Sequence, residues 1–367
     1  MNARLLLSNG MTFSGKSFGA HCVGDGEVVF NTAMTGYEQS LTDPSYRGQI
    51  LCFTFPMIGN YGIADDEKDE YGMAKYFESE DIHVRGVIVN EFSDAPSHHL
   101  LKEKLNTWLA QKGIPGIYDV DTRALTQVLR EHGVMLGQIV PDDMEAKKEI
   151  QDPNETNLVA EVSCAEVHVL EPKEYCGITI AAIDTGIKNN ILRSFLRRGV
   201  RILRCPWNTD ISRLEHDFDA LFLSNGPGNP EAVAGEIGKN IAYAREKKLP
   251  IFGICLGNQI LALSMGAKTF KMPYGHRGGN QPCMDMRTQK AVITSQNHGF
   301  AVDEKTLPQE MEVWFTNLND KTVEGIRHVS ENISSVQFHP EACPGPQDTQ
   351  YLFDAFIKEV QSAKSHI

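Results

Sequence analysis

Between residues 177 and 264 the sequence alternates short apolar runs with stretches of helical pattern. ITIAAID, VRILRCP, ALFLSN and PIFGIC have the length of buried strands, and KNNILRSFLRRG has apolar residues at helical spacing. Strands that alternate with helices favour an open, mostly parallel α/β sheet covered by helices on both faces. In such a sheet, the side chains that carry out chemistry gather at the carboxyl ends of the strands.

The N-terminal part has a different pattern. ARLLL, GEVVF, GQILCFTF and VRGVIV have the character of short strands joined by turns, with helices expected over 98–112 and 121–132. A chain of 367 residues is long enough for two domains. We predict a β-rich α+β domain over 1–150, a polar linker region over 151–176, and an α/β domain over 177–367 that ends in a helix over 348–360.

Composition excludes several classes of function. The formal net charge of −13 argues against a nucleic-acid surface, because phosphate binding needs clustered Lys and Arg. No apolar stretch approaches the ~20 residues that span a bilayer, and the N-terminus does not have the pattern of a signal peptide. The eight cysteines lack the paired spacing of disulfides or zinc ligands. We therefore expect a cytoplasmic protein with no nucleic-acid or membrane partner and no metal.

Cys255 follows one of the apolar runs, within Gly-Ile-Cys-Leu-Gly (253–257). A Gly-x-Cys-x-Gly segment between a strand and a helix is the thiol counterpart of a nucleophile elbow. The helix N-terminus favours a thiolate there, and the Leu256 amide could donate to an oxyanion. The alternative is a buried structural cysteine.

His339 and Glu341 lie far downstream, in Gln-Phe-His-Pro-Glu (337–341). Pro340 biases His339 toward extended backbone, in which residues two apart point the same way. The two side chains could therefore act together as a base and an orienting acid for Cys255, in an acyl-transfer site. A simple loop is the alternative.

Two further features could complete such a site. Gln259 lies four residues after Cys255, on the same helix face, and could bind a polar substrate or be merely solvent-exposed. The loop Asn225–Pro230 follows an apolar run and exposes amides, so Gly228 could supply a second oxyanion donor. The loop could also be only a tight turn.

These motifs resemble the class I (triad-type) glutamine amidotransferases, and the whole chain resembles the small subunit of carbamoyl-phosphate synthase. The amidotransferase motifs are GICLG, SNGPG and the late HPE. The segments that match the small subunit are NTAMTGYEQSLTDPSYRGQI (31–50), PMIGNYGI (56–63), GIYDVDTRALTQVLREHG (116–133), IKNNILRSFLRRG (187–199), GHRGGNQP (275–282) and SQNHGFAVDE (295–304).

The resemblance implies that Cys255 attacks the side-chain amide of L-glutamine and forms a γ-glutamyl thioester. His339 would act as general base and acid, and Glu341 would orient it. The resemblance also implies a set of residues that bind glutamine, two of which, Leu256 and Gly228, supply oxyanion amides. The set is Ser45, Gly226, Gly228, Leu256, Gln259, Asn297, Gly299 and Phe300.

The resemblance also implies a partner. Ammonia would pass to a large synthetase subunit, which holds the ATP and metal and makes carbamoyl phosphate from bicarbonate for pyrimidine and arginine biosynthesis. We expect no cofactor in this chain and a higher hetero-oligomer. Two alternatives are a synthetase with a different ammonia acceptor and a non-catalytic regulatory partner of the synthase. The chain departs from the family at Asn258, where His is usual, and at Thr185, where an aromatic residue is usual.

Two other glycine-containing motifs are set aside. Residues 10–17 formally satisfy the Walker A pattern, but the sequence that follows is strand-like rather than helical. GHRGGNQP (275–282) follows no suitable strand–helix pair, so a structural loop is expected there.

Overall fold

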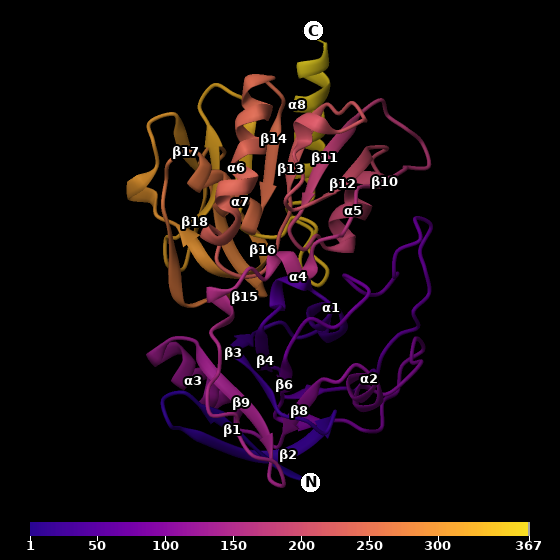
Figure 1. Ribbon diagram of the computed structural model, residues 1–367, viewed down its shortest axis with the longest axis vertical. Helices are drawn as coiled ribbons and strands as arrows, with labels where there is room; N and C mark the ends of the chain where they lie inside the picture. Colours follow the sequence, from indigo (N-terminus) through magenta and orange to yellow (C-terminus); the bar gives the residue numbers. More distant parts are fainter. Residues whose placement is uncertain (366–367) are drawn as a thin grey trace. The chain divides into compact units, whose positions relative to one another are not determined.

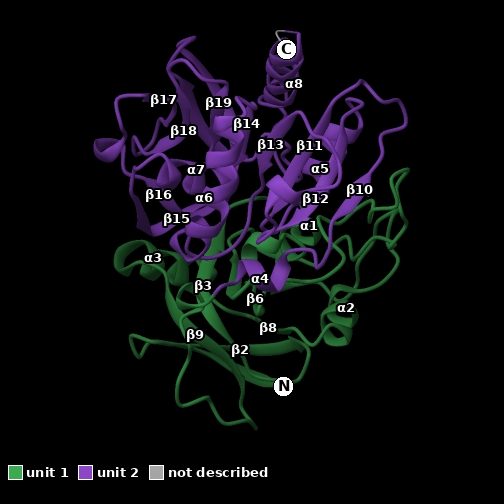
Figure 2. Cartoon of the chain, turned by 45° about the horizontal axis from the view of Figure 1, so that its top comes forward, with its two compact units in different colours: residues 1–156 green, residues 157–367 purple. Residues whose placement is uncertain are grey.

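The computed structural model describes residues 1–365. Contacts divide the chain into two compact units, Met1–Thr156 and Asn157–Ile367 (Figure 2). The division lies inside the stretch 151–176 that the sequence assigns to a linker. The part of this stretch after Thr156 belongs to the second unit.

The first unit, all of which is described, is built on a closed barrel with the strand order β1-β2-β8-β6-β4-β3-β9. The barrel strands are β1 (Asn2–Leu7), β2 (Thr12–Gly19), β3 (Gly24–Asn31), β4 (Gln49–Phe53), β6 (Gly86–Ile88), β8 (Pro115–Tyr118) and β9 (Met135–Pro141). The other elements are β5 (Met57–Ile58), β7 (Glu91–Phe92), α1 (Tyr37–Leu41), α2 (Leu105–Gln111), α3 (Thr122–His132), η1 (Pro44–Tyr46) and η2 (Pro153–Glu155).

Local sequence explains several of these elements. Asp121 caps α3, because its carboxylate accepts a hydrogen bond of 2.9 Å from the Ala124 amide. The helix expected over 98–112 begins only at Leu105. The Walker-like Lys16 and Ser17 lie inside β2, so no helix N-terminus follows them to hold a phosphate.

Within residues 157–365, ten strands form one sheet in the order β10-β12-β11-β13-β14-β19-β18-β17-β15-β16 (Figure 1). The strands are β10 (His168–Leu170), β11 (Thr179–Asp184), β12 (Arg201–Pro206), β13 (Ala220–Leu223), β14 (Ile251–Ile254), β15 (Thr269–Asp285), β16 (Lys290–Val302), β17 (Met311–Asn317), β18 (Val323–His328) and β19 (Ile333–Val336). The other elements are α4 (Val159–Val162), α5 (Asn189–Leu196), α6 (Glu231–Glu246), α7 (Leu256–Ser264), α8 (Tyr351–Lys364), η3 (Ile211–Arg213) and η4 (Glu304–Thr306).

The five central strands, β12, β11, β13, β14 and β19, are parallel, as the sequence predicts, while the flanking strands pair antiparallel. The expectation of a loop over 275–282 is wrong, because these residues lie inside β15. Register shifts between Lys271 and His276 and between Gly278 and Gln281 interrupt its pairing with β16. These irregularities hide the strand in the sequence, because they break the alternation of apolar and polar residues.

Helices cover both faces of the parallel part of this sheet, as predicted. In β13, Leu221 and Leu223 belong to a core cluster with α6 and α7. Phe222 points to the opposite face, because successive side chains of a strand alternate. There its ring packs edge-on against Phe195 of α5, which also contacts Phe353 of α8, with ring centroids 5.0 Å apart in both pairs. Within residues 1–365, no helix is both long and apolar enough to span a membrane.

Candidate active site

Cys255 occupies a sharp turn between β14 and α7. Its backbone has φ 55° and ψ −103°, a positive-φ conformation that a residue with a side chain rarely adopts. The flanking glycines are required by packing. A Cβ on Gly253 would come within 2.9 Å of the Gly257 backbone, and a Cβ on Gly257 within 2.3 Å of the Leu223 carbonyl oxygen. The structure therefore has the elbow that the Gly-x-Cys-x-Gly pattern predicts.

The first two backbone amides after Cys255 have different roles. The Gly257 amide donates to the Ser224 carbonyl at 3.0 Å and is used by the fold. The Leu256 amide, the first of α7, makes no hydrogen bond to any of the described residues. It is therefore free to donate to an oxyanion at the helix N-terminus.

His339 reaches Cys255 because β19 and β14 are parallel neighbours. Ile254 pairs with Val336, and the Cys255 amide donates to the Val336 carbonyl at 2.8 Å. The chain after β19 therefore leaves the sheet at the same carboxyl edge as the nucleophile. His339 is held there by its amide, which donates to the Ser295 carbonyl at 2.8 Å.

The two ring nitrogens of His339 have different neighbours. Nδ1 lies 2.7 Å from Glu341 Oε1, whereas the buried Nε2 has no hydrogen-bond partner within residues 1–365 and is left for the nearby Cys255 sulfur. Burial opposes a charged imidazole, but the Glu341 carboxylate and the Cys255 sulfur outweigh it and raise the pKa of His339. The imidazole is therefore positively charged near neutral pH.

Lys188, which the sequence reasoning did not assign to the site, lies behind Glu341. Its Nζ donates to Glu341 Oε1 at 3.0 Å and to the Ala342 and Cys343 carbonyls at 2.8 and 3.3 Å. Burial alone would raise the pKa of Glu341, but Lys188 and then His339 hold it well below its ordinary value. The sequence held one signal for a special role of Lys188. This lysine directly precedes a helix, where its positive charge opposes the helix macrodipole.

The structure gathers most of the other predicted site residues around Cys255. Asn297, Gly299 and Phe300 lie on β16, where the Asn297 carbonyl is 3.5 Å from Cys255 Sγ. Gln259 lies on α7, and its amide donates to the Phe300 carbonyl at 3.0 Å. These contacts bring one face of α7 and one segment of β16 to the nucleophile.

The loop after β13 contains Gly226 and Gly228. A Cβ on Gly226 would meet the Thr185 carbonyl at 2.0 Å and a Leu256 methyl at 2.9 Å, so only glycine fits. The departure at Thr185 has a structural role here. Its hydroxyl bonds to the Ser224 and Asn225 carbonyls at 3.1 and 2.9 Å, which ties β11 to this loop.

Ser45 is the predicted glutamine ligand that lies in the first unit. It is buried in η1, where its amide donates to Asp43 Oδ1 at 2.9 Å. Its part in binding glutamine stays a prediction.

A buried ion-pair cluster supports β15 and β16. His276 Nδ1 lies 3.1 Å from Glu324 Oε1, and its Nε2 lies 2.8 Å from Asp320 Oδ2. With a carboxylate at each nitrogen, the ring is an imidazolium and has no lone pair for a metal. Burial opposes this charge, but the two carboxylates raise the pKa of His276 from 6.5 to about 9.

This cluster predicts a pH effect on stability. A histidine pKa that is higher in the folded state stabilises the protein fully below pH 6.5, and the stabilisation is lost as pH rises through about 9. We expect Glu324→Gln to lower the free energy of unfolding more at pH 6.5 than above pH 9. Urea unfolding at both pH values checks this, with Glu312→Gln as the exposed control. An equal loss at both pH values would contradict the ion-pair assignment.

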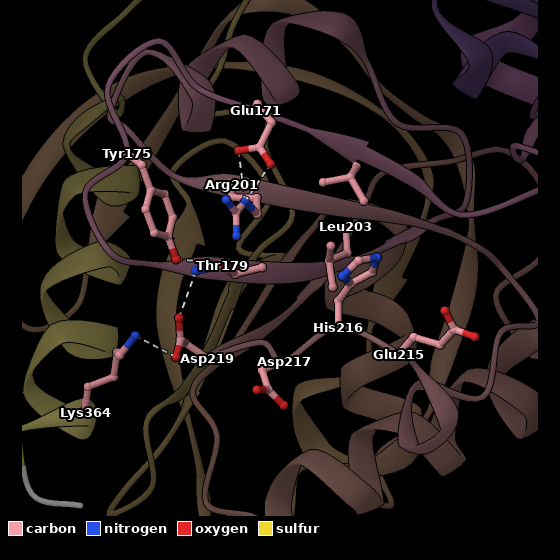
Figure 3. A pocket seen from close by; sticks show the side chains of 11 residues that line it. Glu171, Tyr175, Thr179, Arg201, Leu203, Glu215, His216, Asp217, Asp219 and Lys364 are labelled. Atoms are coloured by element: carbon pink, nitrogen blue, oxygen red, sulfur yellow. Dashed lines mark hydrogen bonds and ion pairs between the residues drawn. The ribbon is translucent and has the colours of Figure 1, made fainter.

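A pocket of about 650 Å³ lies at the opposite ends of the strands, where β11 and β12 begin (Figure 3). Four of its charged side chains form two ion pairs, Arg201 with Glu171 at 2.9 Å and Lys364 with Asp219 at 2.8 Å. None of the predicted site residues lines it. The candidate active site is therefore the carboxyl edge of the sheet around Cys255.

Comparisons with known proteins agree with this geometry. A family model described as Carbamoyl-phosphate synthase small chain, CPSase domain, matches residues 5–139. A second, described as Glutamine amidotransferase class-I, matches residues 181–359 and so includes Cys255, His339 and Glu341.

Similar proteins cover the whole chain. The carbamoyl phosphate synthase arginine-specific small chain of Phaeosphaeria nodorum is 46% identical over 369 residues, which is 100% of this chain and 77% of that protein. The same protein of Aspergillus fumigatus is 46% identical over 99% of this chain and 81% of its own length. The multifunctional protein CAD of Squalus acanthias is 47% identical over 99% of this chain, which spans 16% of CAD. The chain belongs to the carbamoyl-phosphate synthase small chain family, with a class I glutamine amidotransferase domain.

Proposed function

We propose that this chain is the glutamine-hydrolysing small subunit of a carbamoyl-phosphate synthase. The observation that carries the proposal is the buried relay from Cys255 through His339 and Glu341 to Lys188. The imidazole lies near the thiol, its Nδ1 is 2.7 Å from the Glu341 carboxylate, and that carboxylate accepts from the Lys188 ammonium at 3.0 Å. This arrangement is suited to acyl transfer through a thioester.

In the first half of the reaction, the Cys255 sulfur attacks the side-chain amide carbon of L-glutamine. The carbonyl oxygen becomes an oxyanion, which the Leu256 and Gly228 amides stabilise. His339 donates its proton to the amide nitrogen, the C–N bond breaks, and ammonia leaves. The product on the enzyme is a γ-glutamyl thioester.

In the second half, His339 takes a proton from water, which attacks the thioester carbon. The C–S bond breaks, and glutamate leaves. Glu341 holds the imidazole by its Nδ1 proton through both halves, and Lys188 keeps Glu341 ionised. The sum is glutamine and water converted to glutamate and ammonia.

The glutamine ligands of this proposal are Ser45, Gly226, Gly228, Leu256, Gln259, Asn297, Gly299 and Phe300. Ammonia passes to a large partner subunit, because this chain has no credible ATP-binding motif of its own. The partner supplies the ATP site and metal for synthesis of carbamoyl phosphate from bicarbonate. We place the complex in the cytoplasm as a hetero-oligomer.

The proposal predicts that the purified chain releases equal amounts of glutamate and ammonia from L-glutamine. Carbamoyl phosphate should form only when a large synthetase subunit, ATP and bicarbonate are added. Both products are measured in parallel, with and without the large subunit. Covalent labelling by a diazoketone analogue of glutamine, followed by peptide mass spectrometry, locates the reactive thiol. Absence of both hydrolysis and a label on Cys255 would support a regulatory protein instead.

A further inference from the structure

A row of buried polar side chains is hydrogen-bonded to Gln259. Gln259 Nε2 lies 3.1 Å from Gln337 Oε1, which also accepts from Asn258 Nδ2 at 3.2 Å. Asn258 Oδ1 accepts from the Ser335 hydroxyl at 2.8 Å. All four side chains are at most 3% exposed, so water does not compete for these hydrogen bonds.

The direction of every hydrogen bond in this row follows from the Phe300 carbonyl. A carbonyl oxygen only accepts, so the Gln259 atom 3.0 Å from it must be the nitrogen. The same nitrogen faces Gln337, whose facing atom must then be the oxygen. The Gln337 oxygen can only accept, so the Asn258 atom that faces it must be the side-chain nitrogen. The side-chain oxygen of Asn258 then faces the Ser335 hydroxyl.

This order leaves two atoms of the row without a partner, the fully buried Gln337 Nε2 and Gln259 Oε1, and only the second is open to a substrate. Gln259 Nε2 is used by both the Phe300 carbonyl and Gln337, whereas Gln259 Oε1 accepts from no group in residues 1–365. Gln259 is one helical turn after Cys255, and its backbone amide donates to the Cys255 carbonyl at 3.3 Å. The site therefore presents a bare acceptor about one turn from the sulfur.

The acceptor matches one end of glutamine. When the substrate amide lies at the sulfur, its α-carbon lies three C–C bonds further along, on the order of 4 Å away. The α-ammonium group at that end is a charged donor, and hydrogen bonds to charged groups are the stronger kind. A Gln259 amide turned the other way would present its NH₂ group and repel this ammonium.

We propose that Gln337, supported by Asn258, is a positioning residue that holds the Gln259 carbonyl toward the α-ammonium of glutamine. Gln337 itself does not touch the substrate. The inference rests on the proposed glutaminase function and deepens it, because it assigns the recognition of an α-amino acid to one buried acceptor. Gln337 and His339 lie two residues apart after β19, so one segment supplies both the base and this support.

The Gln337 amide offers a conservative variant. Its Nε2 has no hydrogen-bond partner among the described residues, so its oxygen carries all of the contacts. Gln337→Glu keeps an accepting oxygen in the same shape, whether the carboxyl is ionised or protonated. Gln337→Met keeps the length and removes the acceptor.

The test compares wild type, Gln337→Met and Gln337→Glu on two substrates. One substrate is L-glutamine, and the other is its analogue with hydrogen in place of the α-ammonium. For Gln337→Met we expect the KM for glutamine to rise roughly 10- to 100-fold, the effect of losing an oriented hydrogen bond to a charged group. The kcat for glutamine, and kcat/KM for the analogue, should each change less than about threefold, and Gln337→Glu should restore the wild-type KM.

Gln138→Met is the matched control. Gln138 is also a buried glutamine with two side-chain hydrogen bonds, both to the Lys147 backbone in the first unit. Its replacement should leave the KM for glutamine unchanged.

If Gln337→Met does not fold, Asn258→Asp makes the same test. Its second carboxylate oxygen would face Gln337 Oε1, turn that amide over, and remove the acceptor from Gln259.

The outcomes separate the two proposals. A wild-type chain that does not hydrolyse glutamine contradicts the proposed function. An active wild type with an unchanged KM in a folded Gln337→Met variant overturns the positioning role. Equal losses on glutamine and on the analogue overturn it as well, because a general distortion would affect both substrates.

Discussion

Cys255→Ser should reduce glutamine hydrolysis at least about 10³-fold, the scale of losing a nucleophile from a catalytic triad. The expected loss has a specific physical cause. A hydroxyl must give its proton to a base before it attacks, but the raised pKa of His339 leaves that ring protonated near neutral pH. The His339 ring therefore cannot take the proton of a serine hydroxyl, so Cys255→Ser lacks an activated nucleophile.

Ammonia release measures this effect directly, with Cys176→Ser as the matched control. Cys176 is an exposed cysteine of the same unit, and its replacement should leave the rate unchanged. Thermal unfolding should show that Cys255→Ser remains folded. A Cys255→Ser chain that hydrolyses glutamine at the wild-type rate would mean that another group is the nucleophile.

Lys188→Met should destabilise the folded protein by about 3–5 kcal/mol, because it removes one of the two cations that pair with the buried Glu341 carboxylate. The Ala342 and Cys343 carbonyls lose their donor as well. Activity should fall at the same time. Without Lys188, the pKa of Glu341 rises, so the acid limb of the pH profile should move to higher pH.

The sign of this shift follows from linkage. Lys188 and His339 hold the folded-state pKa of Glu341 below its ordinary 4.5, so its contribution to stability is complete above that pH and is lost as pH falls. Removing Lys188 makes this loss begin at a higher pH. Profiles of kcat/KM against pH and urea unfolding check both effects.

A double variant distinguishes an unpaired charge from a simple packing defect. Adding Glu341→Gln to Lys188→Met removes the buried charge and should recover part of the lost stability, but not the activity. Lys239→Met breaks an exposed pair with Glu236 and should leave stability and activity close to wild type. No recovery in the double variant would contradict the role of charge.

The nucleophile and its base could be predicted because each depends on local chain geometry. Gly253 and Gly257 allow a strand to turn abruptly into a helix, which exposes the residue between them. The reason expected for Glu341 is wrong in detail, because Pro340 and Glu341 lie in a turn, closed by the Ala342 amide on the His339 carbonyl at 3.1 Å, rather than in extended chain. This local turn still brings the Glu341 carboxylate to the His339 ring. The structure places the three side chains together at the carboxyl edge of the sheet.

Lys188 could not be assigned in this way, because its partner Glu341 is 153 residues away in the sequence. Gln337 stands beside the predicted base but has no recognisable role in the sequence, since its hydrogen bond to Gln259 spans 78 residues. The long strand β15 was mistaken for a loop over 275–282, because its pairing irregularities interrupt the strand pattern.

The sequence by itself determined the parallel α/β sheet, the turn at Cys255 and the family, because these depend on hydrophobic periodicity, glycine spacing and local motifs. Only the tertiary structure decided which buried partners complete the site: the Lys188 ammonium behind Glu341 and the Gln337 amide behind Gln259. The physical reason is that buried polar atoms must find partners, and pairing of parallel strands brings those partners together from distant segments.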